Sequence, residues 1–235
     1  MILLDAADAD RATVDALFAD TGVLVVTGFV DPDTAGRAAA EVDDVVAADP
    51  DRRPTFADQG VGDQRETVVR NWGLGEVRDR IPTCRSILRD PRLEEWATAI
   101  CGRSFKRSTG SIASTFAGCG QAWHQESRDP HPRHFTLNRI VFAAAVPPER
   151  GRLIVVPGSH TAGDIPTGGG WDDLDGQVAV APPAGAVVLM HSRCFHMVER
   201  NRTSTPRSQF NGRVLPPECP DDITAFPLFR AGPWS

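Results

Sequence analysis

Apolar and polar positions follow a helical pattern in the first part of the chain. Three segments carry apolar residues at the spacing of a helix face: Arg11–Ala19, Thr34–Ala48 and Pro91–Cys101. An Asp-Pro pair stands at the start of the second and the third, which is typical of a helix start. A β-branched run at Val23–Val26 predicts one strand between the first two helices. We therefore expect residues 1 to about 105 to form a helical support.

The pattern changes to short β-type runs after about residue 106. The runs are Ser111–Phe116, His134–Val146, Arg152–Val156, Gln177–Val180, Ala186–His191 and His196–Glu199. Turn clusters rich in Pro and Gly separate them, with no helical pattern between. Many short strands without intervening helices indicate an antiparallel sandwich or barrel. The prediction is a mainly β protein with flanking helices, a double-stranded β-helix (cupin-like jelly roll), with its core at about 106–235 in a single domain, 1–235.

Two segments are predicted to be loops that border a site. Asp51–Glu66 is polar and shows no period, and long loops in compact domains are often lids or binding segments. The Gly-rich segment 168–171 lacks the Lys-Ser/Thr of a phosphate-binding loop. We expect it to be a flap that places Trp171 over the barrel mouth.

Composition fits a globular protein with its own core. The chain has 235 residues, of which 41% are apolar and 24% charged. Its five cysteines are scattered and form no C-x-x-C pair, so we interpret them as reduced thiols rather than as disulfides or a zinc site.

Charge and hydropathy exclude several classes of partner. The net charge is −6 and no basic run occurs, which argues against nucleic acid, because phosphate contacts need clustered cations. No apolar run approaches the roughly 20 residues that cross a bilayer. The acidic start is unlike a signal peptide, so we expect a cytoplasmic protein. A small-molecule substrate is expected, and the oligomeric state stays open.

The residues that carry chemistry lie around His124. Residues two apart in a strand project from the same face, so His124 and Glu126 are expected to point the same way. His196 begins a later strand and is the candidate for a third ligand. Two imidazoles and one carboxylate leave one face of an octahedral ion open, as in non-haem Fe(II) oxygenases. His191 competes for the third position, but its place at the end of an apolar strand favours a structural role.

Arg207 follows His196 by eleven residues. Arginine is the planar, bidentate partner of a carboxylate. If one end of 2-oxoglutarate chelates iron, its far carboxylate needs a cation deeper in the barrel, and Arg207 could supply it.

Taken together, these motifs make the sequence similar to a known family. The set of His124-x-Glu126, the turn Pro157-Gly158-Ser159-His160, the run from Gly185 to His196, and Arg207 resembles the phytanoyl-CoA dioxygenase-like branch of Fe(II)/2-oxoglutarate dioxygenases, over about residues 110–214. The resemblance implies the cofactors Fe(II), 2-oxoglutarate and O2. It also implies that His124, Glu126 and His196 are iron ligands and catalytic residues. Arg207 would then bind the C5 carboxylate of 2-oxoglutarate.

The chain departs from the family pattern at two positions. The usual carboxylate ligand is Asp, and Glu126 is one methylene longer. Val198 stands where a small hydroxyl residue is often found, which puts one contact to the cosubstrate in doubt. Halogenating relatives lack the carboxylate, so Glu126 argues against halogenation.

Six further residues are candidates for contacts with cosubstrate or substrate. Gln121 and Asn138 are the candidates for the cosubstrate. The substrate candidates are Trp123, Arg128, Arg139 and Trp171. Each has an alternative: Trp123 as core packing, the two arginines as solvated surface charges, and Trp171 as part of a disordered loop.

The sequence therefore predicts an Fe(II)- and 2-oxoglutarate-dependent dioxygenase. We expect it to oxidise, by hydroxylation, an unactivated C–H bond of a small metabolite of secondary or amino-acid metabolism. One alternative is a cupin-type isomerase or epimerase that does not use 2-oxoglutarate. The other is a cupin fold that binds a ligand without catalysis.

Overall fold

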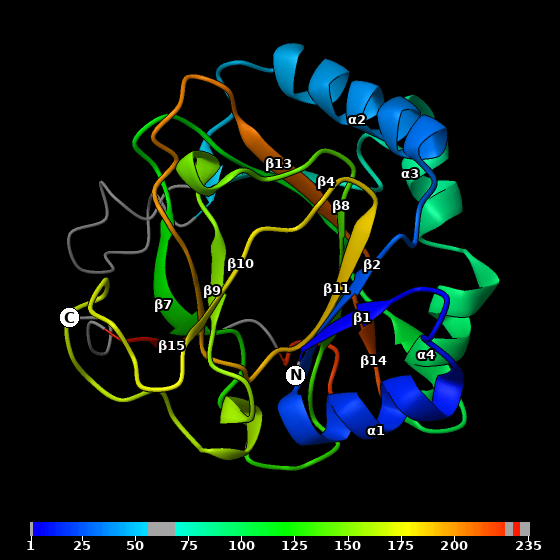
Figure 1. The fold of residues 1–235 in the computed structure, drawn as a ribbon, viewed down its shortest axis with the longest axis vertical. Helices are drawn as coiled ribbons and strands as arrows, with labels where there is room; N and C mark the ends of the chain where they lie inside the picture. The colour runs from blue at the N-terminus through cyan, green and yellow to red at the C-terminus, as the bar shows by residue number, and fades with distance from the viewer. Residues whose placement is uncertain (1, 56–68, 224–227, 231–235) are drawn as a thin grey trace.

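The computed structural model describes residues 2–55, 69–223 and 228–230, and its strands form two sheets (Figure 1). Most of the predicted loop Asp51–Glu66 lies outside the described residues. The large sheet runs in the order β1 (Leu3–Asp5), β2 (Val23–Thr27), β11 (Ala186–His191), β8 (Leu137–Phe142), β13 (Arg207–Asn211), β6 (Ser111–Thr115), β4 (Val69–Gly73), β3 (Pro54–Thr55). In addition, β14 (Val214–Leu215) pairs with β8, and β5 (Lys106–Arg107) pairs with β14. The small sheet runs in the order β10 (Val178–Val180), β9 (Leu153–Val155), β12 (His196–Val198), β7 (Gln121–Gln125), β15 (Leu228–Phe229).

Helices cover the outer face of the large sheet (Figure 1). They are α1 (Arg11–Thr21), α2 (Pro32–Ala47), α3 (Pro82–Ile87) and α4 (Pro91–Cys101), and short 3-10 turns occur at Arg78–Arg80, Pro148–Arg150 and Ser159–Thr161. The α1 helix begins where the Asp10 side chain accepts a hydrogen bond from the Thr13 amide, and it ends at Gly22, whose φ of 66° suits glycine. Three of these helices match the periodic segments of the sequence, whereas α3 was not predicted.

The N-terminal part of the chain does more than support the barrel. Strands β1 to β4 pair within the large sheet, and β2 lies between β1 and β11. The strand expected at Val23–Val26 corresponds to β2, whereas β1, β3 and β4, which also precede residue 105, were not predicted. The mainly β architecture with flanking helices agrees with the prediction.

Buried apolar side chains form three clusters, of which the third, around Trp123, lies on the small sheet. The first packs the helices onto the large sheet, with Leu93 and Trp96 of α4 against it. The second lies between the sheets and includes Val25, Val155 and Val188. Because this inner layer fills only part of the space between the sheets, a polar cavity remains in the rest.

Two further observations bear on the sequence predictions. All five cysteines are free thiols. Within the described ranges, no helix has the length and apolar character needed to cross a bilayer.

Candidate active site

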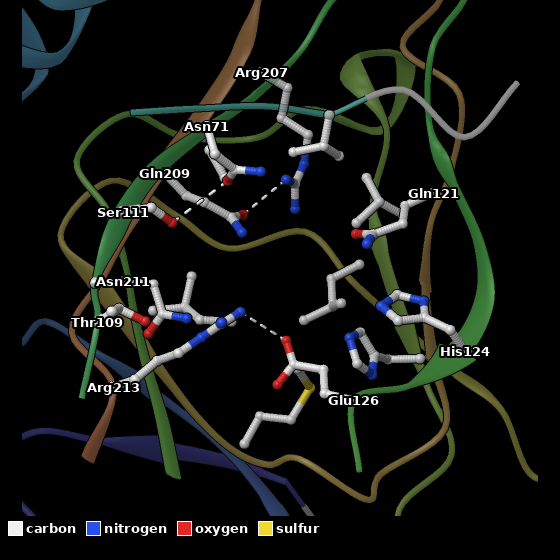
Figure 2. Close-up of a pocket in the computed structure, with 18 of the residues that line it drawn as sticks. Asn71, Thr109, Ser111, Gln121, His124, Glu126, Arg207, Gln209, Asn211 and Arg213 are labelled. Carbon is white, nitrogen blue, oxygen red and sulfur yellow. Dashed lines mark hydrogen bonds and ion pairs between the residues drawn. The ribbon is translucent and has the colours of Figure 1, made fainter. Parts of the chain in front are cut away.

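A cavity of about 430 Å³ lies between the two sheets. Its walls come from β4, β6 and β13 of the large sheet and from β7, β9 and β12 of the small sheet. The side chains of His124, Glu126, Arg207 and Gln121 all face it (Figure 2). The structure thus brings five residues of the predicted site together, since His196 lines the same cavity.

His124 and His196 form one wall of the cavity. The two residues pair across β7 and β12, and both rings are buried. Nδ1 of His124 lies 2.8 Å from the carbonyl oxygen of Ala122, and Nδ1 of His196 lies 2.9 Å from that of Cys194. A carbonyl oxygen only accepts, so each Nδ1 carries the proton and each Nε2 keeps a lone pair for a metal. Burial lowers the pKa of both imidazoles, which keeps them neutral.

The register between β7 and β12 shifts by one residue within the site. His196 pairs with His124, but Val198 pairs with Gln121, so three residues of β7 span what two span on β12. This irregularity allows Gln121 and His124, which are an odd number of positions apart, to line the same cavity.

Glu126 follows the end of β7, and its carboxylate is held by two other residues. Arg213 donates to Oε1 at 2.9 Å, and the Asn138 amide donates to Oε2 at 2.6 Å. Burial would raise the pKa of Glu126, but the charge of Arg213, together with the Asn138 hydrogen bond, outweighs it and lowers the pKa. The side chain is therefore an anion. Figure 2 shows its carboxylate directed toward Arg213.

Asn138 was expected to contact 2-oxoglutarate, but it does not line the cavity. It is fully buried on β8 and does not belong to the cavity lining. Its amide nitrogen is used by Glu126, and its oxygen accepts from Asn211 and Arg213. This position gives Asn138 a role behind Glu126 and does not support the predicted contact with 2-oxoglutarate.

The donor types at this wall fit a ferrous ion. Two neutral imidazoles with open Nε2 atoms and one ionised carboxylate are the 2-His-1-carboxylate set. In the described part of the chain, however, no three His, Cys, Asp or Glu side chains stand close enough together to hold a metal. The reason lies in Glu126, whose carboxylate is turned to Arg213 and Asn138. The donor types therefore match the ion, while the carboxylate is bound by Arg213 and Asn138.

Arg207 lies on another wall of the cavity and is 2% exposed. Its Nε donates to the carbonyl of Gly151 at 2.8 Å, and one terminal nitrogen donates to Gln209 at 2.7 Å. The other terminal nitrogen is buried and has no hydrogen-bond partner among the described residues. Burial lowers the pKa of Arg207 to about 10, so the side chain remains a cation at neutral pH. A buried cation with an unsatisfied donor is suited to an incoming carboxylate.

The two tryptophans predicted near the substrate lie on the opposite face of the small sheet. Trp123 alternates with His124 and points outward, where it packs in one cluster with Met197 and Trp171. Its indole N–H donates to the carbonyl of Asp172 at 2.9 Å. Neither tryptophan lines the cavity. The expectation of Trp171 as a flap over the barrel mouth, and of Trp123 as a site wall, is therefore not supported.

The two arginines predicted to clamp a substrate also lie elsewhere. Arg128 is exposed and pairs with Asp164 at 2.9 Å. Arg139 is buried, pairs with Glu94 at 3.1 Å, and donates to the carbonyl of Gly212. Since both guanidinium groups have partners away from the cavity, the predicted clamp is not supported.

The rival ligand His191 is structural in this fold. Its ring stacks on Phe135 with centroids 4.3 Å apart, and the ring of His160 lies 5.2 Å from it, centroid to centroid. It does not line the inter-sheet cavity. His196 therefore remains the candidate for the third position.

Sequence reasoning missed the polar residues of the large-sheet wall. Gln209 and Asn211 line the cavity beside Arg207 because all three occupy the same face of β13. That alternation could have been read from the sequence. Arg213 also lines the cavity, but it follows the end of the strand, and its ion pair with Glu126 is a long-range contact that no local pattern signals.

The fold and this cavity define a class of protein: a jelly-roll fold with two histidines, a carboxylate and a buried arginine around one cavity between its sheets. The chain belongs to the phytanoyl-CoA dioxygenase (PhyH) family, whose model matches residues 18–209. Enzymes of this family depend on Fe(II), 2-oxoglutarate and O2, so the predicted enzyme class and cofactors are confirmed.

Solved structures share the fold over nearly the whole chain. The epimerase SnoN, in complex with Fe3+, alpha ketoglutarate and nogalamycin RO, superposes with a TM-score of 0.68 at 22% identity, covering 94% of this chain and 87% of that one. The alpha ketoglutarate dependent carbocyclase SnoK from nogalamycin biosynthesis gives 0.67 at 19% identity, covering 97% and 88%. AviO1 from Streptomyces viridochromogenes Tue57 gives 0.65 at 22% identity, covering 90% and 97%. No curated protein matches by sequence. At these identities the likeness establishes the fold, and the jelly-roll prediction is confirmed.

Proposed function

We propose that this enzyme oxidises a C–H bond of a small-molecule metabolite and that hydroxylation is the outcome. His124, Glu126 and His196 would hold Fe(II), and Arg207 would bind the C5 carboxylate of 2-oxoglutarate. One observation carries the proposal. Arg207 and the two imidazoles with free Nε2 atoms line the same inter-sheet cavity, and one buried nitrogen of Arg207 has no hydrogen-bond partner in the described part of the chain.

The bound iron, with 2-oxoglutarate and O2, would supply the oxidising chemistry, and the protein would supply position and environment. The carbonyls of Ala122 and Cys194 fix the imidazole rings with Nε2 toward the cavity. Arg207, anchored by Gly151 and Gln209, would fix the far end of the cosubstrate. Gln121, which lines the cavity on the side of the two histidines, would donate to the cosubstrate.

The cavity also suits a reaction that must exclude water. Its apolar lining includes Ile140, Leu153 and Met190, which come from both sheets. A volume of about 430 Å³ is within the range of small-molecule sites, roughly 300–1,000 Å³. These features favour a small substrate held between the sheets.

Two structural neighbours favour a second outcome of the same chemistry. SnoN is an epimerase and SnoK is a carbocyclase, and both are described as alpha ketoglutarate dependent enzymes of nogalamycin biosynthesis. We therefore propose natural-product metabolism as the setting. Product mass separates the outcomes, because hydroxylation adds an oxygen atom, epimerisation leaves the formula unchanged, and ring closure by oxidation removes two hydrogens.

The test is coupled turnover. The protein, loaded anaerobically with Fe(II) and 2-oxoglutarate, is exposed to O2 and assayed for succinate and CO2. Succinate formation that His196→Ala abolishes supports the proposal. Metal binding without succinate, across a panel of candidate metabolites, would favour an isomerase that does not use 2-oxoglutarate. Absence of both would favour a ligand-binding cupin fold.

A further inference from the structure

The carboxylate of Glu126, a proposed metal ligand, is bound by a cation of the protein, Arg213. Arg213 occupies Oε1 and Asn138 occupies Oε2, so each oxygen already has a hydrogen bond. The Glu126 side chain is 15% exposed and that of Arg213 is 28% exposed. A partly buried, charge-assisted pair of this kind is stronger than a surface salt bridge.

Arg213 holds the carboxylate together with the amide beside it. Its Nε donates to the oxygen of Asn138 at 3.0 Å, while another of its nitrogens donates to Glu126. Asn211 donates to the same Asn138 oxygen at 2.7 Å. The Asn211 oxygen accepts from the backbone N–H of Arg139, which ties the cluster to β8. The carboxylate is therefore fixed on the large-sheet side of the cavity.

This arrangement explains why the histidines and Glu126 do not form a closed metal site in the described residues. Held by Arg213 and Asn138, the carboxylate does not stand close enough to the two imidazoles to share a metal with them, so a divalent cation there needs it to move. We infer that Arg213 is a latch on Glu126: it holds the carboxylate while the site lacks metal, and it weakens metal binding because the ion pair must open. The inference rests on the proposed metal site.

The glutamate and the arginine both have room for such an exchange. Glu126 has one more rotatable bond than the aspartate usual in the family, which extends the reach of its carboxylate. Arg213 lines the inter-sheet cavity and also a second, more open cavity, of about 600 Å³, on the side of Arg139 and Gly212. Once released, the guanidinium can remain hydrated there. The longer side chain of Glu126 and its ion pair with Arg213 therefore act together in this exchange.

The first experiment measures metal affinity directly. Arg213→Met keeps an unbranched side chain of similar length but removes the competing cation. We expect anaerobic titration with Co(II) or Fe(II), followed by the metal absorption bands, to show about tenfold tighter binding, which corresponds to about 1.4 kcal/mol. Without added metal, the melting temperature of this variant falls, because a carboxylate is left without its cation. With metal, the rise in melting temperature is larger than for the wild type.

Arg52→Met is the matched control. Arg52 lines the same cavity but pairs with Glu76 at 2.7 Å and does not contact Glu126. The Arg52→Met substitution removes one positive charge from the cavity lining and leaves the ion pair of Arg213 with Glu126 intact. We expect its metal affinity to stay within about twofold of the wild type, as for charges screened by solvent. Equal tightening in both variants would indicate general electrostatics and would overturn the latch.

A double-mutant cycle separates the latch from a structural role of Arg213. In a Glu126→Gln background the ion pair is already absent, so Arg213→Met is expected to leave metal affinity unchanged. The same tightening in both backgrounds would overturn the inference. If Arg213→Met does not fold, Arg213→Gln, which keeps a neutral donor, takes its place in the cycle.

Failure of the latch and failure of the proposed function give different results. If Arg213→Met binds metal with unchanged affinity while His124→Ala still loses metal binding, the latch is overturned. The proposed metal site is then retained. Metal binding that His124→Ala does not reduce, or no metal binding by any of the proteins, overturns both.

Discussion

His196 lies opposite His124 in the antiparallel pairing of β12 with β7, and their ring centroids are 4.1 Å apart. Each ring is fixed by a hydrogen bond from Nδ1 to the carbonyl two residues earlier. The pair therefore combines residues from two distant stretches of sequence, each oriented by its own strand. This relationship is the geometric basis of the proposed metal site.

Either imidazole is expected to be indispensable for metal binding. His124→Ala and His196→Ala each remove one of two nitrogen donors, so both metal uptake and turnover should be lost. Anaerobic titration with Fe(II) or Co(II) measures the first, and succinate formation measures the second. His134→Ala is the control, because His134 pairs with Asp129 outside the cavity. Full activity in either site variant would contradict the ligand assignment.

Arg207 is expected to set the affinity for the cosubstrate. In Arg207→Met the C5 carboxylate loses a charge-assisted pair of about 1.5–3 kcal/mol, so KM for 2-oxoglutarate should rise about 10- to 100-fold. Initial rates of succinate formation at varied 2-oxoglutarate provide the measurement. Arg128→Met removes an exposed arginine that pairs with Asp164, and its KM should equal that of the wild type. An unchanged KM in Arg207→Met would assign the anion to another residue.

Trp123 is expected to affect stability rather than substrate binding. It is fully buried on the outer face of the small sheet, so Trp123→Ala should lower the free energy of unfolding by about 3–5 kcal/mol. Denaturant unfolding measures the loss. The milder Trp123→Phe should fold and keep the wild-type KM for substrate. A large change of KM in that variant would place Trp123 in the site after all.

His191 is expected to make the fold sensitive to acid. Burial lowers its pKa to about 3, whereas in the unfolded chain the pKa of a histidine is about 6.5. As pH falls below about 6.5, this imidazole becomes protonated in the unfolded state, whereas in the folded state it stays neutral down to about pH 3. The free energy of unfolding should therefore decrease over this window by up to about 1.4 kcal/mol per pH unit.

The measurement for His191 is a comparison of slopes. Denaturant unfolding of the wild type and of His191→Phe is followed from about pH 7 to pH 5, within the window set by the ordinary histidine pKa. The variant loses the hydrogen bond from the Arg193 amide at every pH, so its absolute stability is not the readout. Its stability should depend less steeply on pH. Parallel curves would show that His191 does not carry the effect.

Local patterns predicted the elements that are long or strongly periodic. The helix Pro91–Cys101 and the strand Ala186–His191 have the bounds expected from the sequence. The predicted strand His134–Val146 is shorter, because the observed β8 covers only Leu137–Phe142. Two-residue strands such as β5 and β15 carry no readable period, since tertiary pairing alone defines them.

Where chemistry and spacing coincide, as for His124, His196 and Arg207, the sequence predicted residues that the structure brings to one cavity. The site was not predictable where a residue's role depends on a partner far along the chain. Arg139 looks like a possible substrate clamp in isolation, but Glu94 on α4 neutralises it. Asn138 sits behind Glu126 for a similar reason, since Arg213 and Asn211 complete its hydrogen bonds.

Because β2 lies between β1 and β11, removal of the N-terminal part of the chain would expose an edge of β11. A shorter expression product that begins near residue 106 would retain β11, every residue of which is buried, but would lack its neighbour β2. The bare backbone of an apolar strand is a template for pairing with another chain. Such a fragment should be recovered as insoluble aggregate, even though it keeps the histidines and the arginine of the cavity.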